Sequence, residues 1–316
     1  MFEGHEMRGL VDVPPRPGKH PAILIVHGAG STDVFHGEGA YNGRYDEMRA
    51  AFRSVGVATV VWDKAGDGCS GGRYIHPDDI YGRADEVHLA IQAVKRRADI
   101  DASRIGLWAI SHGGWVAPMV AVRTRDVAFL ILVSSPAKDF YSTWGYQAHQ
   151  QLRADSIPEA QAREAIAVMH RALNLSDLGA SFEEFSAAVA PLRKYPVFRE
   201  KFGLTGGTEQ SYAAGRDPRF SRTWTTSADR FLADVDVPVL ALFGNRDIQV
   251  DWRQSVEVFR DVFAHSGNQA AKIKVFRNAD HNLFAARTKD APPRFVNGYL
   301  ATMAEWLQAR GFAQVP

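Results

Sequence analysis

Short continuous apolar runs recur along the chain and alternate with segments of helical periodicity. Continuous runs are typical of strands that are buried on both faces of a sheet. The apolar runs cover 21–27, 57–62, 104–110, 127–133, 237–243 and 272–276. Apolar residues recur every three to four positions, as in amphipathic helices, over 45–55, 79–98, 112–122, 252–264 and 294–309. The alternation predicts an α/β fold with a mostly parallel central sheet flanked by helices, and the first dozen residues are a candidate antiparallel edge.

The alternation stops after Pro136 and resumes at Val237. The intervening segment has helical stretches and pieces rich in Gly and Pro, but no comparable apolar run. Because the strand pattern then resumes, we expect one sheet domain that carries an insertion. The predicted organisation is a sheet domain over 1–136 and 234–316 and a helical cap over 137–233.

Composition and charge narrow the class of protein. The chain has 316 residues, of which 46% are apolar and 23% charged, as in average globular proteins. The net charge is +1, so we expect neither nucleic acid nor an anionic membrane surface as a partner. The single cysteine, Cys69, excludes an internal disulfide and a cysteine-rich zinc site. With no secretory pattern at Met1–Leu10 and no run of roughly 18 apolar residues, the expectation is a soluble cytoplasmic protein without a membrane span.

A serine follows the third apolar run and precedes a predicted helix. In an open parallel sheet, functional residues gather at the carboxyl ends of the strands. Ser111 stands there between the small residues Ala109 and Gly113, close to the G-x-S-x-G pattern of a nucleophile elbow. The alternative is an ordinary serine at a helix N-cap. The position between strand and helix favours a nucleophile.

An acid and a histidine follow the last two apolar runs. A catalytic serine needs a base, and the base needs an orienting group. Asp247 and His281 supply both in the chain order Ser, Asp, His. Taken singly, Asp247 is explained equally well as a turn residue or cap, and His281 as a surface histidine. Their coincidence with Ser111 at strand ends favours a triad, with Asp251 and Asp280 as the competing acids.

The segment His27–Gly30 follows the first apolar run and is a candidate oxyanion loop. Main-chain N–H groups at such a position stabilise the negative charge of a tetrahedral intermediate. We expect the N–H groups of Ala29 and His112 to form this oxyanion hole. The imidazole side chains of His27 and His112 are expected to be structural rather than catalytic.

Together these four loops resemble the serine-hydrolase branch of the α/β-hydrolase superfamily, and most closely the bacterial esterase D-like proteins near the dienelactone-hydrolase and prolyl-oligopeptidase-like groups. Those proteins often carry D-K-R-G-x-G-x-S-x-G, and residues 63–72 of this chain read D-K-A-G-D-G-C-S-G-G. The chain departs from the pattern at Ala65, and in the elbow at Ala109 and His112. The resemblance implies a serine esterase that forms an acyl-enzyme from a small-molecule ester and needs neither cofactor nor metal.

Other interpretations share part of these features. A peptidase or an acyl thioesterase would use the same triad, and a non-catalytic binding protein could use the same fold. A homo-oligomer is a further candidate partner, and the sequence leaves the oligomeric state open. Tyr141 and Trp144, early in the insertion, are candidate substrate contacts, and packing of the cap explains them equally well.

Residues 63–72 contain two further features that can suggest a ligand site. Residues 66–71 form a G-x-G-x-x-G pattern, but no helix pattern opens there to receive a pyrophosphate, so we do not expect a dinucleotide site. Cys69 lies in the same predicted turn. No histidine near it in the sequence predicts a Cys–His pair, and no metal site is expected.

Overall fold

The computed structural model describes residues 2–39, 45–74, 79–215, 226–286 and 292–313. The chain forms two compact units, each described by itself below. The first unit consists of Met1–Ala137, Ala228–Asp247 and Trp252–Pro316, and the second of Lys138–Ser227 and Ile248–Asp251.

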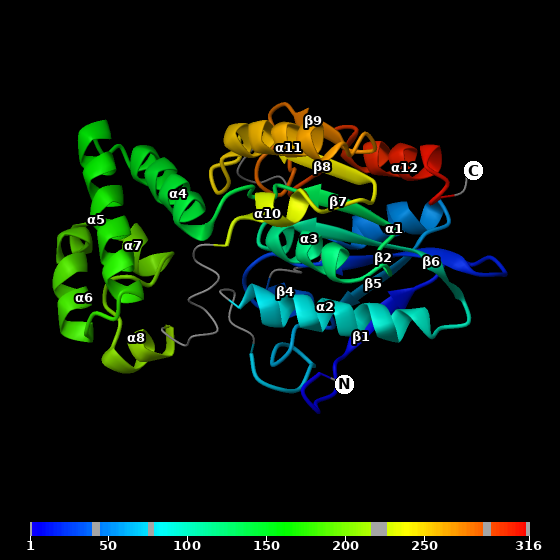
Figure 1. Ribbon diagram of the computed structural model, residues 1–316, viewed down its shortest axis with the longest axis horizontal. Coiled ribbons are helices and arrows are strands. Elements are labelled where there is room, and N and C mark those ends of the chain that lie inside the picture. The colour runs from blue at the N-terminus through cyan, green and yellow to red at the C-terminus, as the bar shows by residue number, and fades with distance from the viewer. Residues whose placement is uncertain (1, 40–44, 75–78, 216–225, 287–291, 314–316) are drawn as a thin grey trace. The chain divides into compact units, whose positions relative to one another are not determined.

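The first unit is built on a seven-stranded sheet (Figure 1). The strand order is β1-β5-β2-β6-β7-β8-β9, and all neighbours are parallel except β1, which pairs antiparallel with β5 at the edge. The predicted fold class is therefore confirmed, including the antiparallel edge near the N-terminus. The strands are β1 (Gly9–Asp12), β2 (His20–Val26), β5 (Ala58–Trp62), β6 (Ile100–Ile110), β7 (Phe129–Val133), β8 (Val239–Gly244) and β9 (Lys272–Phe276).

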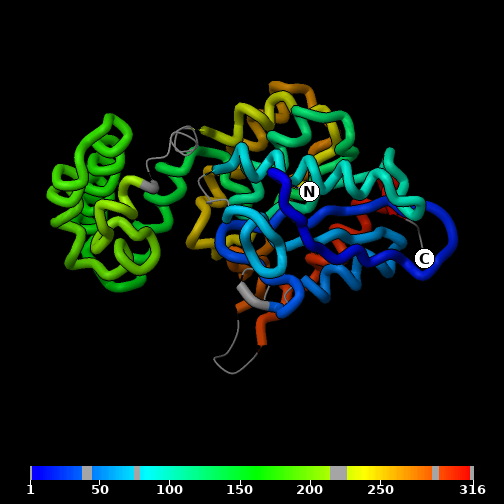
Figure 2. Tube along the Cα trace, turned by 90° about the horizontal axis from the view of Figure 1, so that it is seen from below, coloured from blue at the N-terminus to red at the C-terminus, as the bar shows by residue number. Residues whose placement is uncertain are grey.

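Helices cover both faces of this sheet, which explains why the apolar runs are continuous. Every residue of β2, β5, β7 and β8 is buried. Helices α1 and α12 pack together, while α3 contacts both α2 and α10, and α10 contacts α11. Figure 2 shows α1 (blue) and α12 (red) on the face opposite α2 (cyan). The helices are α1 (Asp46–Ser54), α2 (Ile80–Lys95), α3 (Gly113–Arg123), α10 (Ala228–Leu232), α11 (Trp252–Ser266) and α12 (Tyr299–Ala309).

Two local features differ from the predicted pattern. The last helix begins at Tyr299 rather than at 294, because Gly298 at its N-cap has a left-handed φ of 81° that a continuing helix cannot contain. A two-stranded hairpin of β3 (Thr32–Asp33) and β4 (Glu38–Gly39) was not predicted. Strands of two residues are too short to show a hydrophobic period.

The second unit is helical. Its first helix is capped by Asp139, whose side chain accepts the N–H of Ser142, and a capping box of Ser181 and Glu184 begins α6. The helix α10 falls within the predicted insertion but belongs to the first unit. The role of the second unit as a cap stays a prediction. Its elements are α4 (Phe140–Ala154), α5 (Glu159–Asp177), α6 (Phe182–Val189), η1 (Ala190–Lys194), α7 (Val197–Glu200) and α8 (Glu209–Gly215).

Within the described ranges of both units, none of the helices has the length and apolar character required to cross a bilayer.

Candidate active site

Ser111 occupies a strained turn between β6 and α3. Its φ is 55°, in the left-handed region that side chains other than glycine rarely adopt. The turn is held by the Ser111 N–H, which donates to the Val133 carbonyl at 3.0 Å, and by the Gly114 N–H, which donates to the Ser111 carbonyl at 2.7 Å. Strain of this kind persists only where the surrounding structure enforces it, and it is typical of a nucleophile elbow.

The glycines after Ser111 are required by close packing. A Cβ atom on Gly113 would lie 2.7 Å from the Val26 carbonyl oxygen, and one on Gly114 would collide with the side chain of Ser135. The bare Gly113 also leaves space for the methyl group of Ala109, which is fully buried. The alanine at the first position of the elbow is therefore compatible with the turn.

The structure brings Asp247 and His281 into direct contact. The Nδ1 atom of His281 donates to Oδ2 of Asp247 at 2.8 Å, and the side chains are 9% and 0% exposed. The competing acid Asp280 is engaged elsewhere, because its Oδ1 accepts the N–H groups of Asn282 and Phe284 at 2.8 and 2.9 Å. Asp247 is thus the partner of the histidine, and Asp280 stabilises the turn that carries it.

Main-chain contacts hold the Asp247 and His281 loops together. They follow the neighbouring parallel strands β8 and β9, so both lie at the carboxyl edge of the sheet. The Arg246 N–H donates to the Ala279 carbonyl at 2.9 Å. A Cβ atom on Gly244 would collide with the same carbonyl, so a glycine is needed for this approach. The 2.8 Å contact between the two side chains rests on this pairing of loops.

The segment His27–Gly30 lies beside Ser111. A Cβ atom on Gly28 would be 3.3 Å from the Ser111 Cβ atom. The N–H of Ala29 donates no hydrogen bond to any residue in the described part of the chain. A donor of this kind next to a candidate nucleophile is a candidate oxyanion-hole group.

The two neighbouring histidine side chains are packed, as the sequence analysis expected. The ring of His27 is fully buried and lies 5.2 Å from the ring of Tyr45. His112 is at the N-cap of α3, is 3% exposed, and its ring lies 6.0 Å from that of Trp115. Of His112, only the main-chain N–H remains a candidate for the oxyanion hole.

Lys64 is a component of the site that the sequence analysis missed. Its Nζ atom donates to the Gly28 carbonyl at 2.7 Å and also to the Gly30 carbonyl, so it binds the main chain on both sides of Ala29. Its side chain is almost fully buried, and this burial, with the nearby Arg83, lowers the pKa of Lys64 to about 7, while Glu86 and Asp67 oppose the shift. The signal in the sequence was a lysine placed directly after Asp63 at the end of a buried strand.

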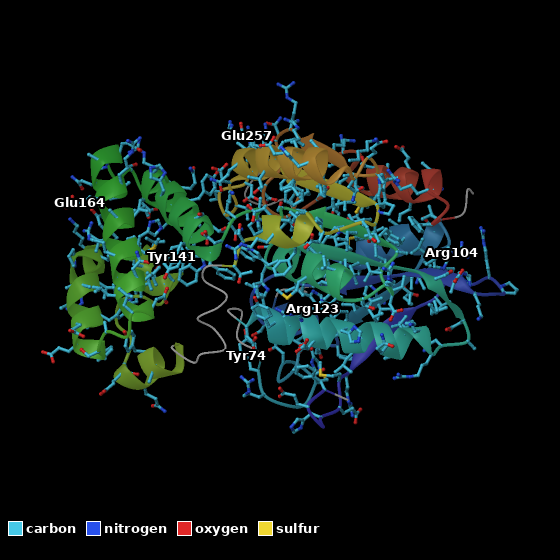
Figure 3. All side chains as sticks on the ribbon, in the orientation of Figure 1. Tyr74, Arg104, Arg123, Tyr141, Glu164 and Glu257 are labelled. Carbon is cyan, nitrogen blue, oxygen red and sulfur yellow. The ribbon has the colours of Figure 1, made fainter. Side chains whose placement is uncertain are left out.

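Tyr141 and Trp144 make their observed contacts within the helical unit. The Tyr141 hydroxyl donates to Asp177, and burial together with that carboxylate raises the pKa of Tyr141. The ring of Trp144 lies 5.1 Å from that of Phe202. Tyr141 is labelled in Figure 3. These contacts agree with packing inside the unit, and contact with a substrate stays a prediction for both residues.

Comparison with known families identifies the family of this chain. Residues 21–188, more than half of the chain, match the family described as serine aminopeptidase, S33. The chain belongs to this S33 family. The match begins in β2 and includes the candidate oxyanion loop and the Ser111 turn, whereas Asp247 and His281 lie beyond it.

Individual relatives of this S33 chain are distant in sequence. It is 21% identical over 290 residues to the esterase EstD of Thermotoga maritima. That match covers 91% of this chain but 60% of the relative, so the chain spans less than two thirds of the relative's length.

Solved structures show the same fold. DcsB, determined in complex with its substrate analogue, has a TM-score of 0.62 at 18% identity, covering 98% of this chain and 96% of its own. A proline iminopeptidase from Mycobacterium smegmatis has a TM-score of 0.56 at 21% identity, with the same coverage. The predicted α/β-hydrolase fold is confirmed, and so is the resemblance to esterase D-like proteins of that superfamily.

Proposed function

We propose that this S33 chain is a serine hydrolase that cleaves a carboxylic ester through an acyl-enzyme intermediate. The observation that carries the proposal is the 2.8 Å hydrogen bond between His281 and Asp247, at the edge of the sheet where Ser111 forms its strained turn. A buried carboxylate on Nδ1 keeps the proton there and leaves Nε2 of the imidazole as a base.

In the proposed first step, the Ser111 hydroxyl attacks the ester carbonyl and His281 takes its proton. Asp247 stabilises the imidazolium that forms. The negative charge develops on the former carbonyl oxygen, where the N–H groups of Ala29 and His112 would donate to it. Collapse of the intermediate breaks the bond to the alcohol oxygen, which receives the proton from His281 and leaves.

The second step repeats this chemistry with water. His281 removes a proton from water, the resulting hydroxide attacks the Ser111 ester, and the acid leaves as the serine regains its proton. Every group that moves belongs to the chain, the substrate or water. The reaction as proposed therefore uses no cofactor or metal.

The family description favours a second candidate, an aminopeptidase with the same catalytic residues. The family is described as serine aminopeptidase, and a proline iminopeptidase shares the fold. We prefer the ester because the matched relative named EstD is an esterase and covers 91% of this chain. An acyl thioester is the third substrate class compatible with the same triad.

The test compares three substrates and one variant. We expect turnover of an aryl ester to exceed that of an acyl thioester and an aminoacyl-arylamide, and Ser111→Ala to lower ester turnover on the order of 10⁴-fold or more. A fluorophosphonate should label Ser111 and spare Ser70, whose hydroxyl donates to the Asp63 carbonyl at 2.7 Å. Labelling that persists in Ser111→Ala would overturn the assignment, and faster cleavage of the arylamide would favour the peptidase.

A further inference from the structure

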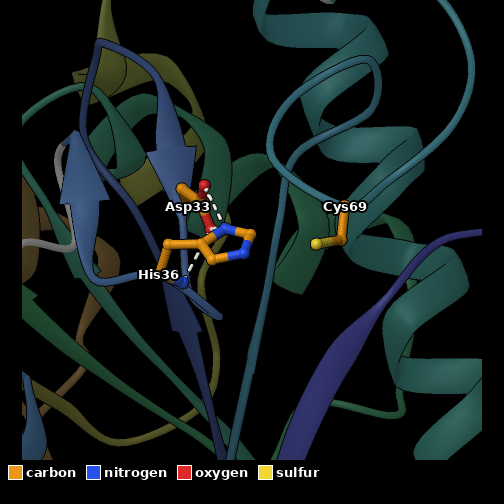
Figure 4. Close-up of side chains that lie close together, drawn as sticks. All are labelled: Asp33, His36 and Cys69. Carbon is orange, nitrogen blue, oxygen red and sulfur yellow. Dashed lines mark hydrogen bonds and ion pairs between the residues drawn. The ribbon is translucent and has the colours of Figure 1, made fainter.

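Three side chains with metal-binding donor atoms meet outside the proposed catalytic residues. They are Asp33, His36 and Cys69, and one donor atom of each lies within 4.8 Å of the other two. Figure 4 shows the imidazole of His36 between the carboxylate and the thiol. No pattern in the sequence indicated a histidine beside Cys69, because His36 is distant along the chain and the β3–β4 hairpin brings it next to the turn after β5.

A buried carboxylate joins the two segments that carry these side chains. Asp63 is fully buried, and its two oxygens accept the N–H of Val34 at 2.6 Å and the N–H of Cys69 at 2.7 Å. Asp67 adds a second link, because its Oδ2 accepts the N–H of Thr32 at 2.6 Å. The main chain on both sides of the cluster is therefore held in place before any ligand binds.

A glycine makes this arrangement possible. Gly68 has a left-handed φ of 48°, and a Cβ atom there would collide with the Asp63 carboxylate. The resulting close approach presents the next N–H, that of Cys69, to Asp63. The backbone of residues 63–69 therefore sets the position of the thiol. The motif of the esterase D-like proteins allows any residue at position 69, so the resemblance does not explain why a cysteine stands there.

The β3–β4 hairpin supplies the other two donor groups of the cluster, His36 and Asp33. The Nδ1 atom of His36 lies 2.7 and 2.9 Å from the two oxygens of Asp33, and the His36 N–H donates to Asp33 Oδ1 at 2.9 Å. The His36 side chain is 66% exposed, whereas that of Asp33 is 22% exposed. The cluster is consequently open to solvent on the histidine side, which provides an entry path for an ion.

We propose that Asp33, His36 and Cys69 bind a divalent cation of the Zn²⁺ type. A thiolate, an imidazole and a carboxylate are the donors that Zn²⁺ and Co²⁺ accept, whereas Mg²⁺ and Ca²⁺ prefer oxygen alone. On binding, the thiol releases its proton to solvent, and the ion replaces the proton that Nδ1 of His36 shares with Asp33. Ligand bonds of about 2.0–2.3 Å require the donor atoms to draw closer, which the exposed His36 ring permits. Water completes the coordination.

The test uses Co²⁺ as a spectroscopic probe and Zn²⁺ as the competitor. Because Cys69 is the single cysteine of the chain, any thiolate-to-cobalt absorption in the near ultraviolet reports this residue alone. We expect one Co²⁺ per chain, displacement by Zn²⁺, and no displacement by Mg²⁺. Cys69→Ser should abolish the absorption and, like His36→Gln and Asp33→Asn, should weaken Zn²⁺ binding by about tenfold or more.

Two control variants separate this site from other histidines. His265→Gln removes an exposed histidine that bonds to the Asp261 carbonyl, and His281→Gln removes the proposed catalytic base. Both should bind Zn²⁺ as the unmodified chain does, with unchanged circular dichroism in all variants. Co²⁺ binding without thiolate absorption, equal affinity in Cys69→Ser, or loss of binding in His281→Gln would each overturn the proposal and leave the ester hydrolysis argument untouched.

Discussion

The ammonium group of Lys64 donates a 2.7 Å hydrogen bond to the main-chain carbonyl of Gly28, next to the N–H proposed to stabilise the oxyanion. A second bond from the same nitrogen reaches Gly30, where φ is 90°. One buried amino group therefore bonds to the main chain on both sides of Ala29. From this position we predict that Lys64 orients the candidate oxyanion loop and does not itself react.

Lys64→Met tests this positioning role. We expect kcat to fall by about tenfold to a hundredfold with little change in KM, since a displaced oxyanion donor weakens binding of the transition state rather than of the substrate. The melting temperature should change little, because removing a buried charge offsets the lost hydrogen bonds. Ester kinetics and thermal unfolding check both expectations, with the exposed Lys19→Met as control. An unchanged kcat in Lys64→Met would contradict the role.

The same lysine predicts a pH dependence of stability. In the folded state burial lowers the pKa of Lys64 to about 7, whereas in the unfolded chain it returns to about 10.5. Between these values the unfolded state binds more protons, so the free energy of unfolding rises with pH by at most about 1.4 kcal/mol per unit. Below pH 7 Lys64 is charged in the folded state as well, and the cost of burying this charge lowers the free energy of unfolding by its full amount.

Urea unfolding at a series of pH values from 6 to 9 measures this contribution. The difference in unfolding free energy between the unmodified chain and Lys64→Met should shift in favour of the unmodified chain as the pH rises above about 7. Because all other titrating groups are common to both proteins, their contributions cancel to first order. A pH-independent difference would mean that Lys64 keeps its ordinary pKa in the fold.

The assignment of the catalytic acid makes a paired prediction. Asp247→Asn should lower kcat by up to about 10⁴-fold, because an amide beside Nδ1 favours the wrong imidazole tautomer. Asp280→Asn should change kcat by less than about tenfold, since the asparagine Oδ1 can still accept the two N–H groups of the turn. The two substitutions remove the same charge at positions 33 residues apart. The reverse ranking of the two kcat values would identify Asp280 as the acid.

Trp144 tests whether the helical unit selects substrates. If its ring contacts the acyl or alcohol group, Trp144→Ala should shift relative kcat/KM among esters of graded size by about tenfold or more, with the smallest esters nearly unaffected. If it only packs against Phe202, all esters should lose activity together and the melting temperature should fall. Leu178→Ala, at an 85% exposed position of the same unit, is the control for both measurements.

Local patterns were sufficient for much of the fold and for the separate parts of the candidate site. Strands such as β7 and β8 were predicted because a strand buried on both faces must be apolar throughout. Ser111 could be identified as a candidate nucleophile because a turn from strand to helix requires small neighbours, here Ala109 and Gly113. In contrast, the start of α12 at Tyr299 was not predicted, because periodicity does not reveal the left-handed φ of Gly298 at its N-cap.

Tertiary structure decided which of these residues meet. The pairing of His281 with Asp247 rather than with Asp280 follows from the loops after β8 and β9, whose order in the sheet no local pattern contains. The hydrogen bond of Lys64 to Gly28 joins segments that are distant in sequence, and so does the approach of Cys69 to His36 within 4.8 Å. The hydrophobic periodicity of a sequence shows only which side chains are buried, because burial depends on how a whole helix or strand packs on average. A specific hydrogen bond or metal ligand depends on the positions of single atoms, and packing of the whole chain sets those positions.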